Sequence, residues 1–130
     1  MKNKVCFILF VLWALFIFSN SMLPAIESSD ISGGISYQIY ELLNLNIDFE
    51  LFHTFIRKCA HFIEYAILGV FAGFAFKKEY FIKIALLCIL VASCDETIQL
   101  FVEGRSGQVS DVLLDSIGSL TGIIFRRTIK

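Results

Sequence analysis

Residues capable of acid–base chemistry interrupt an apolar part of the chain at residues 57–64. Arg57, His61 and Glu64 are spaced i, i+4 and i+7, so on a helix they share one face of about 60°. Histidine titrates near neutral pH and a neighbouring carboxylate can orient its ring, which makes His61 and Glu64 a candidate general acid–base pair. The alternative role for these two residues is a structural hydrogen bond between helices.

A second polar group lies near the end of another apolar segment, residues 80–102. Asp95, Gln99 and Glu103 follow at four-residue intervals, and Glu96 lies at the edge of the same helix face. An ionised carboxylate that faces lipid is costly, so such residues normally face a bundle interior or a hydrated cavity. Asp95 and Glu96 are therefore candidate catalytic residues, and Gln99 is a candidate binding residue.

A third polar group opens the last apolar segment. Asp111 and Asp115 share a helix face with Gly118 and Gly122. Small residues at four-residue spacing let two helices approach closely, so this acidic face is also expected to be a packing face. Both aspartates are candidate binding residues.

The segments that must position these groups account for most of the chain. Hydrophobic residues make up 57% of the 130 residues, and the mean hydropathy of +0.75 lies outside the range of soluble proteins. A membrane-crossing helix needs about 20 mostly apolar residues. Four segments approach that length, namely 5–23, 57–76, 80–102 and 109–125. We expect an all-α fold in which residues 1–130 form a single membrane domain, a bundle of four transmembrane helices.

The distribution of basic residues predicts an orientation. The bases that precede the first segment, follow the last or separate the second from the third all fall on one side of the expected bundle: Lys2, Lys4, Lys77, Lys78, Lys83, Arg126, Arg127 and Lys130. Only Arg57, Lys58 and Arg105 fall on the other side. Because cytoplasmic loops carry the excess of Lys and Arg, both termini are predicted to be cytoplasmic. The three polar groups then meet in the outer leaflet.

The first apolar segment also resembles a signal peptide. It begins with "MKNK", continues with an apolar core and ends with the small residues of "SNS". Cleavage there would leave three spans with the same orientation.

The longest connection, residues 24–56, lies between the first and second segments. Its "ESSDISGG" is typical of a turn or linker. From Ile35 onward, apolar residues recur at helical spacing beside Gln38 and Glu41, which predicts a short interfacial helix on the outer leaflet. A loop packed over the helix ends is the alternative. Asp48 is expected to cap a helix that starts near Phe49 and extends the second span above the membrane.

The bases and acids of the outer leaflet suggest two kinds of site. Arg57, Lys58 and Arg105 form a candidate anion site for a phosphate or carboxylate headgroup. The alternatives are ion pairs with the nearby acids and extension toward ordinary lipid headgroups. Because acids outnumber bases here, the excess negative charge must be compensated. Protonated carboxyls, a charged His61, a cationic substrate group or a divalent cation would each do this.

A metal site is one of these alternatives. Imidazole and carboxylate ligands suit zinc or manganese, and His61, Glu64, Asp95 and Glu96 form a candidate ligand set. The sequence itself requires no cofactor. The net charge of -1 and the lack of a long basic run argue against nucleic acid as a partner. No nucleotide-binding loop, dinucleotide fingerprint or serine-nucleophile elbow is present.

Three stretches of the sequence resemble a known family. They are "FIFSNSMLPAIESSDISGGIS", "FIRKCAHFIEYAILGVF" and "CDETIQLFVEGRSGQVSDVLLDSIGSLTG", and they are similar to the VanZ-like family, which is named for a teicoplanin-resistance protein. The positions that carry the resemblance are Arg57, Lys58, His61, Glu64, Tyr65, Asp95, Glu96, Gln99, Arg105, Asp111, Asp115 and Gly118. Two positions depart from the family pattern. Glu103 stands where proline often precedes the Gly-Arg pair, and Asp115 stands where the name-giving members have asparagine.

The resemblance implies a bacterial integral membrane protein of the cell envelope, in some members linked to reduced susceptibility to lipid-tailed glycopeptides. Three functions follow as hypotheses. The first is a pocket that binds an amphiphilic envelope lipid or lipoglycopeptide through Arg57, Lys58, Tyr65 and Arg105, with teicoplanin-type protection as its effect. The second is an intramembrane enzyme that modifies such a lipid by acid–base chemistry. The third is a proton-linked transporter or assembly factor, which at this length would need an oligomer to form a transport path.

Overall fold

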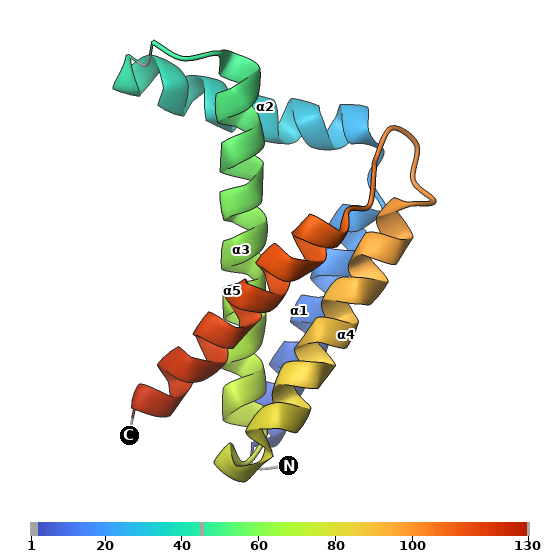
Figure 1. The fold of residues 1–130 in the computed structure, drawn as a ribbon, viewed down its shortest axis with the longest axis vertical. Coiled ribbons are helices and arrows are strands. Elements are labelled where there is room, and N and C mark those ends of the chain that lie inside the picture. Colours follow the sequence, from blue (N-terminus) through green and yellow to red (C-terminus); the bar gives the residue numbers. More distant parts are fainter. Residues whose placement is uncertain (1–2, 45, 130) are drawn as a thin grey trace.

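The computed structural model describes residues 3–44 and 46–129, and this part of the chain is entirely helical (Figure 1). The helices are α1 (Lys4–Ser21), α2 (Ala25–Leu43), α3 (Phe49–Ala75), the short 3-10 helix η1 (Lys78–Tyr80), α4 (Phe81–Gln99) and α5 (Val109–Thr128). The prediction of an all-α fold is confirmed.

Two of these helices, α1 and α3, are long and apolar enough to cross a membrane. The 27 residues of α3 exceed what a bilayer requires, so this helix extends beyond the apolar segment expected from the sequence. Helices α4 and α5 contain 19 and 20 residues and carry more polar side chains. Each of the four predicted apolar segments corresponds to one helix.

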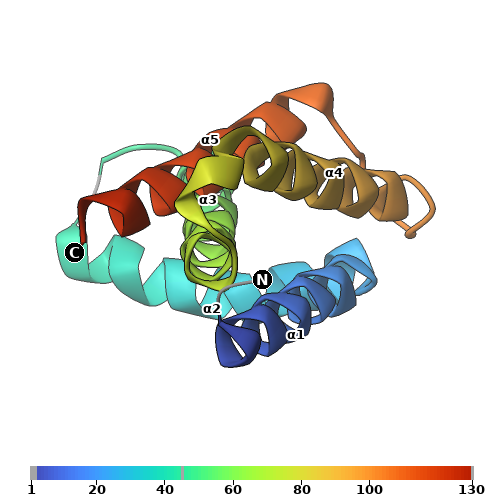
Figure 2. The same ribbon diagram turned by 90° about the horizontal axis from the view of Figure 1, so that it is seen from below.

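Helix α3 is the central element of the bundle. It packs against each of the other four α-helices, and Figure 2 shows it end-on, with α1 to one side and α4 and α5 to the other. Helix α2 lies across the upper end of α3, whereas the chain termini and η1 lie at the lower end (Figure 1). The buried apolar core lies below the polar groups and includes Phe10, Ile17, Leu68, Ala72, Cys88 and Ile123.

Helices α3 and α5 approach each other at glycines. A Cβ atom added at Gly118 would lie 2.6 Å from the carbonyl oxygen of Phe62, and one added at Gly122 would overlap the carbonyl oxygen of Ala66. From the other side, a Cβ at Gly69 would overlap the carbonyl oxygen of Ser119. The packing face expected from the glycine spacing is therefore a backbone-to-backbone contact.

The start of α2 differs from the expectation of a turn and linker. The helix begins directly after Pro24, whose φ of -53° is already close to helical, and it includes the "ESSDISGG" segment. Two contacts stabilise it there: the Ala25 N–H donates to the Glu103 carbonyl at 3.1 Å, and the Ser32 hydroxyl lies 2.9 Å from Nε2 of His53. Tertiary contacts thus outweigh the low helix propensity of these residues.

The extension of α3 begins as predicted. The Asp48 side chain accepts a hydrogen bond from the Leu51 N–H at 3.1 Å and caps the helix at Phe49. Above the apolar part of α3, Phe49 packs edge-on against Tyr37 and Tyr40 of α2. These aromatic contacts attach α2 to the α3 extension.

Helix α4 ends earlier than the sequence pattern predicted. It stops at Gln99, and residues 100–108 form turns in which Gly104 has a φ of +73°. The expected continuation of the second polar stripe to Glu103 was wrong, because Glu103 lies in this loop and is exposed. Asp95 lies about one helical turn below the end of α4.

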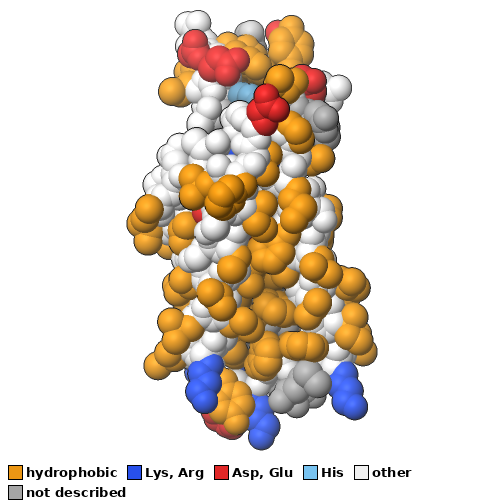
Figure 3. All heavy atoms as spheres, turned by 90° about the vertical axis from the view of Figure 1, so that its right-hand side faces the viewer, with side chains coloured by type: hydrophobic (Ala, Val, Ile, Leu, Met, Phe, Trp, Pro, Cys, Tyr) orange, Lys and Arg blue, Asp and Glu red, His pale blue; other side chains and the backbone are white. Residues whose placement is uncertain are grey.

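The surface is divided along the long axis of the molecule. In the face shown in Figure 3, hydrophobic side chains cover most of the middle and lower parts, Lys and Arg gather at the lower end, and most Asp and Glu lie near the upper end. Exposed bases in the elements at the lower end are Lys4, Lys77, Lys78, Lys83 and Arg127. The apolar surface is of the kind that lipid chains cover.

Candidate functional site

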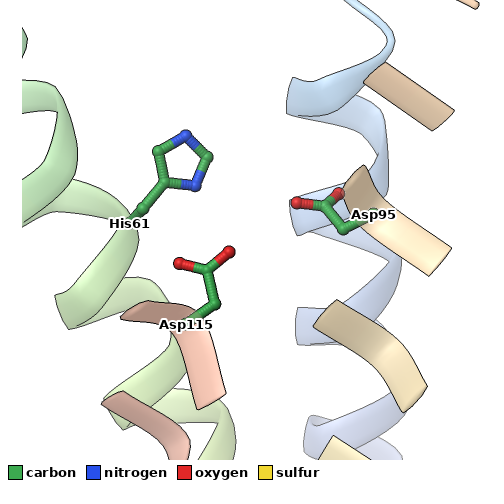
Figure 4. Close-up of side chains that lie close together, drawn as sticks. All are labelled: His61, Asp95 and Asp115. Atoms are coloured by element: carbon green, nitrogen blue, oxygen red, sulfur yellow. The ribbon is translucent and has the colours of Figure 1, made fainter. Parts of the chain in front are cut away.

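The polar stripes of α3, α4 and α5 meet at one point. His61, Asp95 and Asp115 come from these three helices, and their side chains point toward one another (Figure 4). One ligand atom from each lies within 4.8 Å of the others. Asp115 reaches this group because Gly118, one turn further along α5, lets the helix lie directly against α3.

Burial and missing partners distinguish this group. The side chains of Asp95 and Asp115 are 0% exposed, yet none of their four carboxylate oxygens has a hydrogen-bond partner in the described part of the chain. The same holds for Nδ1 of His61 and for the hydroxyl of Tyr65, which lies one turn further along α3. Buried polar atoms in proteins nearly always have partners. This many unpartnered atoms in one place therefore require an explanation.

Glu64 lies about one turn further along α3 than His61. Its Oε2 is 3.9 Å from Nδ1 of His61, which is too long for a hydrogen bond but within reach of an ion pair with a charged imidazole. The backbone of Glu64 is fixed, since its carbonyl accepts a 2.9 Å hydrogen bond from the indole of Trp13 on α1. The side chain is about one quarter exposed and lines a cavity.

The side chains of Glu96 and Gln99 form hydrogen bonds near the loop that follows α4. Oε2 of Glu96 accepts from the backbone N–H of Gln108 at 2.9 Å, at the start of α5. The amide of Gln99 donates to Ser21 of α1 at 3.2 Å and to Oε1 of Glu96 at 3.4 Å. Glu96, which the sequence suggested as a metal ligand or catalytic group, thus lies outside the group of His61, Asp95 and Asp115.

The basic residues are used in three different ways. Lys58 forms an ion pair with Asp111 at 2.5 Å, at the surface between α3 and α5. Arg105 donates from Nε to the Leu23 carbonyl and from Nη2 to the Asn20 carbonyl, both at 3.0 Å. Arg57 forms no ion pair or side-chain hydrogen bond with any described residue.

The electrostatics of Arg105 reflect its crowded position in the 100–108 loop. Burial lowers the pKa of the guanidinium, and the nearby positive charge of Arg57 lowers it further. An arginine remains charged even after such a shift. The two guanidinium groups therefore repel each other, and an anion placed between them would relieve that repulsion.

Two cavities border on these residues. One, of about 350 Å³, lies between α1, α2 and α3 and includes Glu64, Ser28 and Ile35 in its wall. The other, of about 330 Å³, lies between α3, α4 and α5 and includes Lys58, Glu96 and Asp111. The residues that line both cavities are Arg57, His61 and Arg105. Asp95, Asp115 and Tyr65 lie in the protein interior.

The structure therefore places the predicted residues in two sets. The inner set comprises the buried residues Tyr65, Asp95 and Asp115 together with His61, whose side chain is about one quarter exposed. The cavity set comprises Arg57, Lys58, Glu64, Glu96, Gln99, Arg105 and Asp111. His61 connects the two sets. Sequence reasoning missed the contribution of α2, whose Ser28, Ser32 and Ile35 line the first cavity. The serines were assigned to a turn, and no local pattern indicated that they would face a site.

Comparison with known proteins identifies the family of the chain. Neither the curated proteins nor the solved structures contain a match to the chain. The family model described as VanZ/LLP1 matches residues 6–130, which is nearly the whole chain and includes both sets of residues. The chain therefore belongs to the VanZ/LLP1 family of membrane proteins.

Proposed function

We propose that this protein binds the headgroup of an amphiphilic envelope lipid in the two cavities that meet at Arg57, His61 and Arg105. The single observation that carries the proposal is that these cavities share two guanidinium groups. Each cavity lies within the size range of small-molecule sites, about 300–1,000 Å³. A lipid headgroup fits such a space, while its acyl chains would remain in the bilayer.

The chemistry of the walls specifies an anionic headgroup. Arg57 has no described ion-pair partner, whereas Asp111 is paired with Lys58 and Glu96 binds the Gln108 N–H. The hydrogen bonds of Arg105 to two carbonyls fix its plane and leave further N–H groups for a ligand. A phosphate or carboxylate between the two guanidiniums would accept paired hydrogen bonds. Glu64 in the same wall favours a ligand that also carries an amine or hydroxyl donor.

We further propose that α1, α3, α4 and α5 all cross the membrane, with both termini in the cytoplasm. The bases at the end that contains the termini support this orientation. Phe10 and Ile17 of α1 are buried in the core, and Trp13 is bonded to α3, which supports retention of this helix rather than its removal as a signal peptide. A fluorescent reporter fused to the C-terminus should fold and fluoresce in the cytoplasm. A periplasmic or extracellular C-terminus would overturn the topology.

Lipid binding can be followed through Trp13, the single tryptophan, because its indole contacts the backbone of a cavity residue. The purified protein in detergent would be titrated with short-chain phosphatidylethanolamine, which carries a phosphate and an amine. We expect Arg57→Ala to weaken binding by about tenfold, the value of one lost charged hydrogen bond. Lys83→Ala, at the opposite end of the bundle, is the control and should bind like the wild type. Equal affinities for all three proteins would contradict the proposal.

The cellular effect that we propose is protection against a lipid-tailed glycopeptide such as teicoplanin. A sensitive bacterial host would express either the wild type or Glu64→Gln at equal membrane abundance. Glu64 lines the first cavity, whereas Glu50 is exposed in the first turn of α3, so Glu50→Gln is the matched control. Protection lost only in Glu64→Gln would link the effect to the cavity. Equal susceptibility of the empty host and of all three expressing strains would remove the proposed resistance role.

A second candidate function is an intramembrane enzyme that modifies such a lipid by acid–base chemistry. The observation that favours it is His61, which lies between a cavity and two buried carboxylates and so can exchange protons with a bound headgroup. The two functions differ in whether the bound lipid is chemically converted. If the wild type converts the titrated lipid to a new species in mass spectra and His61→Ala only binds it, the protein is an enzyme. Recovery of unchanged lipid from the wild type supports binding alone.

A further inference from the structure

We propose that His61, Asp95 and Asp115 bind a divalent metal cation of the zinc or manganese type. The three residues come from α3, α4 and α5, and one donor atom from each lies within 4.8 Å of the others (Figure 4). Ligand atoms about 2.1 Å from a common cation lie at most about 4.2 Å apart, so small side-chain rotations are enough to complete the site.

The unpartnered oxygens are the independent evidence. All four carboxylate oxygens of Asp95 and Asp115 are buried without a hydrogen-bond donor in the described chain. Two protonated acids would be expected to bond to each other or to a neighbour, and no such bond is formed between these side chains. A cation would satisfy oxygens from both residues at once.

The nearby bases are committed to other partners or lie in the cavity walls. Lys58 pairs with Asp111 at the surface, and Arg105 binds the carbonyls of Leu23 and Asn20. Two carboxylates and a neutral imidazole carry a formal charge of about -2, which a divalent cation balances. Imidazole among the ligands favours zinc over magnesium or calcium, which prefer oxygen ligands, and the two carboxylates also suit manganese.

Two further residues can support the cation. The Tyr65 hydroxyl is buried without a partner one turn from His61 and can donate to a ligand carboxylate or to a metal-bound water. His61 also lines both cavities, so the cation would lie between the buried carboxylates and the proposed headgroup site. The metal site goes beyond the proposed function, because only protein side chains would bind the cation and no lipid is needed for it to bind.

Metal content tests the inference without any lipid. The full chain would be purified in detergent, stripped with a chelator, incubated with Zn²⁺ or Mn²⁺, desalted and analysed by elemental mass spectrometry. We expect about one ion per wild-type chain and loss of most of it in Asp95→Asn and in Asp115→Asn, since each variant removes a charged ligand. Asp48→Asn is the matched control. It removes an exposed aspartate at the start of α3, outside both cavities and outside the candidate ligands, and asparagine also caps a helix, so this variant should retain the metal.

Thermal unfolding shows whether a variant has lost the site or its fold. An ion that binds the folded state raises the Tm, so Zn²⁺ or Mn²⁺ should raise the Tm of the wild type and of Asp48→Asn. Folded Asp95→Asn and Asp115→Asn should show no such rise. No uptake by the wild type, or equal uptake by all four proteins, would overturn the metal site. The Trp13 titration tests lipid binding separately, so either proposal can fail without the other.

Discussion

Two parts of the α3–α5 interface are built in opposite ways, although they lie next to each other. At the glycine crossing, defined by Gly69, Gly118 and Gly122, backbone atoms of the two helices touch directly. At the polar end, His61 and Asp115 face each other across the same pair of helices, with oxygens that have no described partner. The close packing of one part fixes the position of charged groups in the other, at a cost in stability that the packing offsets.

The largest expected effect comes from breaking the glycine crossing. In Gly122→Val the new side chain would overlap the carbonyl oxygen of Ala66, which is backbone and cannot move aside. We expect the free energy of unfolding to fall by about 3 kcal/mol or more, because overpacking forces the helices apart. Thermal unfolding in detergent measures this. The lipid affinity should fall as well, since α5 would carry Asp111 away from the second cavity.

Gly33 in α2 provides the matched control. It is helical, and nothing lies within 4 Å of an added Cβ. Gly33→Ala should therefore raise stability by about 0.5–1 kcal/mol, the difference in helix propensity. If both glycine variants shifted the Tm in the same direction, the backbone contact at the crossing would not be the reason for the loss.

A smaller effect is expected where a side chain organises the polar end. Glu96→Ala removes the acceptor of the Gln108 N–H and should cost about 2 kcal/mol, the range of hydrogen bonds to charged groups. Hydrogen exchange should rise in residues 100–108 because the loop loses its attachment to α4. Glu96→Gln keeps an acceptor oxygen and should recover most of the loss. A variant Glu96→Gln as unstable as Glu96→Ala would instead indicate that the negative charge itself is required.

Removing the cap of the α3 extension should lower the free energy of unfolding by about 1 kcal/mol. Asp48→Ala removes the hydrogen bond to the Leu51 N–H. Exchange should increase in the first turn of α3 and in the part of α2 that packs on Phe49. The glycine crossing should keep its protection. Faster exchange around Gly69 would show that the two regions unfold together rather than separately.

The smallest effect is expected at the surface ion pair. Side chains of Lys58 and Asp111 are 46% and 28% exposed, so Lys58→Ala should change the free energy of unfolding by less than about 1 kcal/mol. The change should shrink further at high salt. A loss above 2 kcal/mol would mean that this pair, and not the glycine crossing, holds α3 to α5.

Local features of the sequence determined a large part of the fold. Hydrophobic segments of sufficient length predicted the helices that became α1, α3, α4 and α5, and Asp48 marked the start of α3. Glycine spacing identified the face of α5 that packs. These features depend on interactions within a few residues or on burial of one helix face, so a linear pattern is sufficient to reveal them.

Helix ends that depend on distant contacts were less predictable. The sequence extended the third apolar segment to residue 102 and made residues 24–34 a linker, whereas α4 ends at Gln99 and α2 begins at Ala25. Both differences involve the contact between the start of α2 and the 100–108 loop, where Ala25 donates to Glu103. Residues nearly 80 positions apart meet there, and no local pattern reports such a contact.

The sequence alone predicted that the ionisable residues of three helices lie at one end of the bundle. Their positions along each helix determine how far they lie along the bundle axis. Only the tertiary structure decided which of them face one another. The glycine crossing sets the separation and rotation of α3 and α5, so Asp115 joins His61 and Asp95, while Glu96 turns to the Gln108 N–H. Partners among charged groups depend on distances of a few ångströms between helices, and these distances follow from side-chain packing rather than from helical periodicity.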